Sequence, residues 1–197
     1  PGELERESTE LRTAGLPRPF WLYLGAAGLM AAGFADFPLI AFHFGKVGVA
    51  PGAWIPMLYA LAMGVDAVAA LIFGRLFDRW GIPSLVLPAI VSAAAAPLLF
   101  LGGVSAAVAG VILWGIGLGA QESVLRAAVA EMVPVERRGA AYGIFNAGYG
   151  LLWFLGSAAM GILYGSSPGW LVLFAAATQF AAVPLLLASG RALKRAR

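Results

Sequence analysis

"GRLFDRWG", residues 74–81, places three charged residues within five positions between two glycines. The runs on either side of it, residues 53–73 and 84–103, are apolar and almost free of charge. An α-helix of about 20 apolar residues crosses the hydrocarbon core of a bilayer, which is about 30 Å thick. Because glycine permits tight reversals of the chain, the stretch predicts a charged turn between two membrane-spanning helices.

The composition indicates the same class of protein. The chain has 197 residues, of which 61% are hydrophobic and only 12% charged, whereas about a quarter of the residues of a soluble domain are charged. Its apolar runs are continuous rather than alternating, which favours helices over strands. We therefore expect an all-α membrane protein with six transmembrane helices. The predicted spans lie near residues 20–42, 53–73, 84–103, 105–130, 141–164 and 170–189.

The basic residues predict the orientation. With six spans, both ends of the chain and the second and fourth connections lie on one side of the membrane. All 13 basic residues except Lys46 fall on that side, and short connections rich in Lys and Arg stay cytoplasmic. We expect a cell (inner) membrane protein with a cytoplasmic linker at 1–19 and a basic cytoplasmic tail at 190–197. The opening residues have neither an initiator Met nor an apolar signal core, which suggests a piece cut from a longer chain.

The charged stretch resembles the signature loop of major facilitator superfamily transporters. The matching residues are Gly74, Leu76, Asp78, Arg79 and Gly81. The family pattern usually continues with basic residues, whereas Ile82 and Pro83 follow here, as in the weaker copy found in the C-terminal half of such transporters. A second stretch, residues 119–150, is similar to the link between the tenth and eleventh helices of bacterial members.

The resemblance implies a fold and a gate. It implies two three-helix repeats of inverted topology, 20–103 and 105–189, which together form half of a major facilitator fold. The usual substrate site lies between two halves, so an N-terminal six-helix half or a second copy of the chain is the expected partner. The resemblance further implies that Asp78, with Arg79, latches the start of the fifth span. The residues expected there are Arg137, Arg138 and Gly139.

Polar side chains inside the spans are costly and therefore candidates for function. Asp36 lies roughly 24 Å from the cytoplasmic start of the first span at 1.5 Å per residue, and Pro38 is expected to interrupt the helix there. Glu122 and Arg126 have the i,i+4 spacing of an ion pair. Either these groups line a substrate or proton path, or the pair and Asp66 support the cytoplasmic gate. The candidate path residues are Asp36, Asp66, Gln121, Glu122, Arg126, Asn146 and Tyr149.

Three further features bear on packing and function. His43 sits at the outer boundary of the first span, where a histidine is usually solvated, and proton coupling is the alternative role. Gly115 and Gly119 have the spacing that lets two helices approach closely. Trp153 lies deep in the fifth span and either packs against its neighbours or contacts the substrate.

The leading hypothesis is a secondary active transporter that moves a small molecule by alternating access, with proton coupling through the acidic residues. The alternatives are a membrane-embedded enzyme and a channel. The sequence has no cysteine and no nucleophile or metal-ligand pattern, so neither an enzyme nor a metal or other cofactor is expected. The sequence contains no re-entrant filter segment of the kind that would indicate a channel. The net charge of +3 reflects the basic residues of the predicted cytoplasmic side. Nucleic-acid binding would require a basic surface with aromatic partners, and the sequence indicates none.

Overall fold

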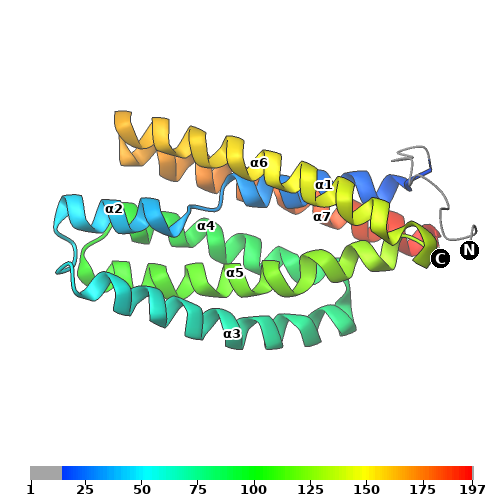
Figure 1. The fold of residues 1–197 in the computed structure, drawn as a ribbon, viewed down its shortest axis with the longest axis horizontal. Helices are drawn as coiled ribbons and strands as arrows, with labels where there is room; N and C mark the ends of the chain where they lie inside the picture. Colours follow the sequence, from blue (N-terminus) through cyan, green and yellow to red (C-terminus); the bar gives the residue numbers. More distant parts are fainter. Residues whose placement is uncertain (1–14, 197) are drawn as a thin grey trace, which may run out of the picture.

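The computed structural model describes residues 15–196, and this part of the chain contains helices and no strand (Figure 1). Six of its stretches are long and apolar enough to span a membrane, which confirms the predicted all-α class with six transmembrane helices. Of the expected linker, residues 1–14 lie outside the described range. The helices are α1 (Arg18–Ala32), α2 (Phe37–Val47), α3 (Trp54–Trp80), α4 (Val86–Leu101), α5 (Val104–Met132), α6 (Arg138–Ser166) and α7 (Pro168–Ala196), with 3₁₀ turns η1 (Ile82–Leu85) and η2 (Val135–Arg137).

The first span consists of two helices, α1 and α2, with residues 33–36 between them. Asp36 is the residue directly before α2, and Pro38 stands in the first turn of that helix. A proline is tolerated there because the N–H groups of a first turn have no partner inside the helix. Pro38 therefore starts the second helix, and the interruption lies ahead of it rather than at the proline itself.

Helix α3 continues through the charged stretch that was predicted to form a turn. It ends at Trp80, and the chain reverses at Gly81, whose φ of +67° would strain a residue with a side chain. The helix persists because Arg75, Leu76 and Arg79 favour helices, and the residues between and after them are tolerated there. The Arg75 guanidinium also donates a hydrogen bond of 3.2 Å to the carbonyl oxygen of Leu71. The predicted turn over 74–81 is therefore helical up to Trp80, and the chain turns at Gly81 alone.

The six spans form two three-helix units, and the main contacts join a helix of one unit to helices of the other. Helix α1 packs against α6 and α7 of the second unit, and α5 packs against α3 and α4 of the first. Helices α4 and α7 contact each other, and successive spans run in opposite directions (Figure 1). These main contacts are interchanged when the two units are interchanged, as expected for inverted repeats.

Glycines allow close helix contacts between the two units. Gly115 and Gly119 of α5 lie against the backbone of Ala62 and Asp66 on α3, where a Cβ atom at Gly115 would stand 2.6 Å from the Ala62 carbonyl oxygen. In the equivalent contact, Gly156 of α6 lies against the backbone at the end of α1. The prediction that Gly115 and Gly119 allow a close helix approach is confirmed.

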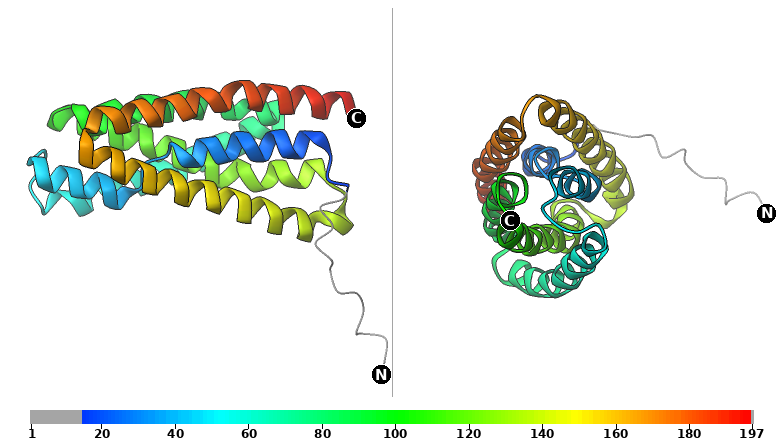
Figure 2. Two further views of the ribbon diagram at one scale, coloured as in Figure 1. Left: turned by 90° about the horizontal axis from the view of Figure 1, so that it is seen from above. Right: turned by 90° about the vertical axis from the view of Figure 1, so that its left-hand side faces the viewer.

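Helix α1 begins and α7 ends at the same end of the bundle (Figures 1 and 2). Two buried hydrogen bonds join these helices along their length, from the Ser189 hydroxyl to the Pro19 carbonyl at 2.9 Å and from the Gln179 amide to the Met30 carbonyl at 3.0 Å. Lys46 lies in the last turn of α2, at the opposite end. The end that α1 and α7 share is the one predicted to face the cytoplasm.

The glycine contact predicts opposite effects for two glycine-to-alanine substitutions. Gly119→Ala would drive its methyl group into the Asp66 carbonyl oxygen, so we expect a loss of about 1–3 kcal/mol in the free energy of unfolding. Gly64→Ala is the control on α3, because a Cβ atom there meets no atom within 4 Å and alanine favours a helix. Thermal unfolding in detergent measures both. Equal stability of the two variants would contradict the close contact.

Candidate substrate site

Asp36, at the break in the first span, is held by helix α6. One carboxylate oxygen accepts a hydrogen bond of 2.8 Å from Trp153 Nε1, and the other accepts one from the Ser157 hydroxyl. The side chain does not cap α2, although Asp36 directly precedes that helix. The carboxylate is therefore engaged with α6 and makes no cap hydrogen bond to α2.

The break is also tied to α5. Trp114 Nε1 donates a hydrogen bond of 2.7 Å to the carbonyl oxygen of Ala35. A carbonyl released by a helix break is costly in a membrane unless it finds a donor. The Trp114 ring stacks on Phe34 with ring centroids 5.4 Å apart. Two tryptophans thus fix the break, Trp114 from α5 and Trp153 from α6.

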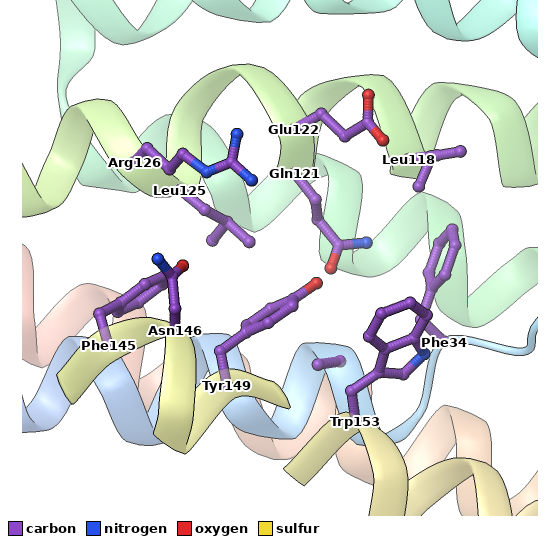
Figure 3. A pocket seen from close by; sticks show the side chains of 11 residues that line it. Phe34, Leu118, Gln121, Glu122, Leu125, Arg126, Phe145, Asn146, Tyr149 and Trp153 are labelled. Atoms are coloured by element: carbon purple, nitrogen blue, oxygen red, sulfur yellow. The ribbon is translucent and has the colours of Figure 1, made fainter. Parts of the chain in front are cut away.

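A first pocket, of about 430 Å³, lies between α1, α5 and α6 (Figure 3). Five of the candidate path residues line it: Gln121, Glu122 and Arg126 from α5, and Asn146 and Tyr149 from α6. Figure 3 shows the Gln121 side chain and the Tyr149 hydroxyl directed toward each other. The other lining residues are Ala31, Phe34, Leu118, Leu125, Phe145 and Trp153. The structure therefore gathers most of the candidate path residues at one site.

A second pocket, of about 740 Å³, contains Asp36 in its wall. It shares Phe34, Leu118 and Trp153 with the first pocket, so the two adjoin. The Phe37 ring lies 4.6 Å from the Tyr59 ring, centroid to centroid. Aromatic side chains from four spans line this pocket, namely Phe34, Phe37, Tyr59, Trp114 and Trp153. The Asp36 carboxylate thus stands in a largely aromatic surrounding.

Gln121 and Asp66 are candidate path residues with a buried acceptor oxygen that has no hydrogen-bond partner in the described part of the chain, as Ser92 and Gln179 also have. Gln121 is 2% exposed, and its Nε2 donates to the Gly117 carbonyl oxygen at 3.3 Å, which leaves Oε1 unpartnered. Asp66 of α3 has one such carboxylate oxygen, but it lines neither pocket. Among residues 15–196, no three His, Asp or Glu side chains gather as ligands for a metal ion. Gln121 thus lines the first pocket, and Asp66 lines neither.

The residues predicted as a gate lie at the bundle end where α1 begins. Asp78 and Arg79 line a pocket with Lys194 of α7. Arg137 and Arg138 donate hydrogen bonds of 3.2 and 3.0 Å to backbone carbonyl oxygens. Both sides of the latch have neighbours of their own in this conformation, so the contact between them stays a prediction. The other gate residues, Gly74, Leu76, Gly81 and Gly139, lie in or beside the end of α3 and the start of α6.

His43 is buried, so the expectation of a solvated histidine was wrong. It is 3% exposed, and its Nδ1 lies 3.0 Å from the Tyr164 hydroxyl oxygen. The ring also lies 5.1 Å from that of Phe100, centroid to centroid. Ile40, His43 and Phe44 form the buried face of α2, because residues three and four apart share one side of a helix. The position of His43 in that pattern decides its burial.

Trp153 and Ser157 are partners of Asp36 that the sequence did not assign to it. Their i,i+4 spacing places them on one face of α6, which is the signal that the sequence contains. That this face meets Asp36 depends on the approach of α6 to α1 at Gly156. Such a contact between distant segments has no local pattern. Tyr59 and Trp114 were missed for the same reason.

A double-mutant cycle tests the hydrogen bond from Trp153 to Asp36. Trp153→Phe keeps an aromatic ring and removes the N–H donor, and Asp36→Ala removes the acceptor. Hydrogen bonds to charged groups contribute about 1.5–3 kcal/mol, so we expect a coupling energy in that range from thermal unfolding in detergent. Trp170→Phe, at the start of α7, is the control and should show no coupling to Asp36→Ala. Additive effects of Trp153→Phe and Asp36→Ala would refute the interaction.

Comparisons with known proteins place the chain in a family. Residues 20–194 match the Major Facilitator Superfamily. Uncharacterized proteins of Mycobacterium bovis and of two strains of Mycobacterium tuberculosis are each 39% identical to the chain over 177 residues, which cover 90% of this chain and 43% of each relative. The chain therefore spans less than half the length of these curated relatives. No solved structure matches it. The chain belongs to the Major Facilitator Superfamily, and its six spans fit half of that fold.

Proposed function

We propose that the protein is a secondary active transporter that moves a small molecule by alternating access. Its family membership supports a transporter of the major facilitator kind. One observation carries the finer proposal, namely the two adjoining pockets lined by polar and charged side chains inside the bundle. Polar side chains from the first, fourth and fifth spans meet there. Binding at such a site between inverted repeats is the arrangement on which alternating access depends.

A second six-helix unit is expected to close these pockets. Helices α3 and α6 stand at opposite sides of the bundle, with α1, α2 and α5 between them (Figures 1 and 2). Large apolar side chains are exposed along both, among them Met57, Val68, Leu71, Leu151, Phe154 and Ile162. Lipid covers part of such a surface. We infer that an N-terminal half or a second copy of the chain covers the rest, including the pocket openings.

The proposed setting is the cytoplasmic membrane, with both termini in the cytoplasm. The support is the bias of basic residues toward the shared end of α1 and α7, with Lys46 opposite. Asp36 and Glu122 are the acidic groups of the two pockets, and a proton gradient would act on the transport cycle through them. A carboxylate that alternately binds a proton and a substrate couples the two by competition.

Cysteine accessibility tests the transport cycle without knowledge of the substrate. The chain contains no cysteine, so Asn146→Cys introduces the single cysteine of this chain in the wall of the first pocket; any cysteine elsewhere in the full-length protein is replaced by serine. We expect a membrane-impermeant maleimide to react with it from both sides, in right-side-out and in inverted vesicles. Cross-linking of the gate in one state should abolish reaction from one side only. A channel would keep access from both sides after cross-linking, and a label reached from one side alone would refute alternating access.

The latch predicts a shift between the two states. Asp78→Asn removes the charge proposed to hold the start of α6. In the Asn146→Cys background, we expect the ratio of labelling from the two sides to change by a factor of about 3 or more, as a loss of about 0.7 kcal/mol or more would produce. Arg75→Gln is the control, since it changes a charge on the same helix outside the signature framework. An unchanged ratio in Asp78→Asn would remove the latch from the mechanism.

A further inference from the structure

We propose that the adjoining pockets bind an organic cation whose apolar part lies against the aromatic wall and whose charge faces Asp36. This inference rests on the proposed transport function and names the class of its substrate. Three independent features of the described residues carry it: the charge of the lining, the aromatic rings around Asp36, and the free acceptor of Gln121.

The lining carries more negative than positive charge. Its charged side chains are Asp36, Glu122 and Arg126, two carboxylates and one guanidinium. The donors to Asp36 are an indole N–H and a hydroxyl, both neutral. These donors satisfy the two carboxylate oxygens and bring no positive charge to them. A carboxylate in a low-dielectric pocket is stabilised by a positive charge beside it, which a cationic ligand would supply.

The aromatic side chains fit the same ligand. The faces of Trp, Tyr and Phe rings attract cations within about 6 Å of the ring centroid. Trp114 contacts Phe34 and Phe37 at centroid distances of 5.4 and 5.8 Å, so these rings form one preassembled wall. Trp153 lines both pockets and donates a hydrogen bond to the Asp36 carboxylate. An anion in this place would meet the ring faces and the Asp36 charge, both of which repel it.

Gln121 supplies an acceptor on the side of the first pocket. Its Nε2 is engaged with Gly117, and its Oε1 is buried without a partner among the described residues. A buried acceptor without a hydrogen bond costs free energy, so a ligand that brings a donor or a positive charge regains it. The lining thus presents a carboxylate in one pocket and a carbonyl oxygen in the other. Both attract the same sign of charge.

A pair of matched probes tests the proposal on the protein expressed at its full natural length. Tetraphenylphosphonium and tetraphenylborate have nearly the same shape and opposite charges. In equilibrium dialysis of the purified protein in detergent, we expect saturable binding of the cation and binding of the anion weaker by about tenfold or more. Asp36→Asn should weaken cation binding by about the same factor, and Asp36→Glu should restore it in part. Glu136→Gln, an exposed change in η2, should leave cation binding unchanged.

The outcomes separate this inference from the transport function. Equal binding of both probes, or cation binding that survives in a folded Asp36→Asn variant, would overturn the cation site. If Asp36→Asn does not fold, the preference of the wild-type protein for the cation decides. Failure of the cation to bind, while the cysteine introduced by Asn146→Cys is still reached in turn from both sides, would refute the substrate class and leave the carrier intact. Loss of alternating labelling would refute the carrier itself.

Discussion

Close backbone contact between helices is the constraint on which this bundle depends. In a bilayer, helices gain nothing from hiding apolar side chains from one another, so packing and interhelical hydrogen bonds hold them together. Gly115 and Gly119 let α5 touch α3, and Gly156 lets α6 touch α1. These contacts join one inverted unit to the other. They also set the distance between α5 and α6 across which the pocket side chains face each other.

The polar site is an exception that this packing makes possible. A broken helix exposes backbone groups that a membrane cannot satisfy, and a carboxylate there needs donors. Trp114 and Trp153 provide them from two different helices, together with Ser157. Each donor reaches the break only because its own helix lies close to α1 or α3. The apolar packing and the polar site are therefore parts of one arrangement.

The class of fold was predictable from the sequence because span length, continuous hydropathy and basic bias are local properties. The glycine contact of Gly115 and Gly119 was predictable from its spacing for the same reason. The place of the helix break was not, because Pro38 is compatible with either side of it. The partners of Asp36 were not predictable either, because they depend on where α6 lies and no local pattern in the sequence records that. The burial of His43 follows the local spacing of Ile40, His43 and Phe44 on α2.

Helix α2 is the shortest α-helix in the described part of the chain. Its attachments are the hydrogen bonds at residues 35 and 36, the contact of His43 with Tyr164, and one narrow buried face. Hinge motions in proteins occur in microseconds to milliseconds and do not require unfolding. The outer part of the first span is thus a separate short helix, joined to α1 through residues 33–36. In the proposed cation site, the residue at this break, Asp36, is also the one that faces the charge of the ligand, so binding and a tilt of α2 relative to α1 would influence each other.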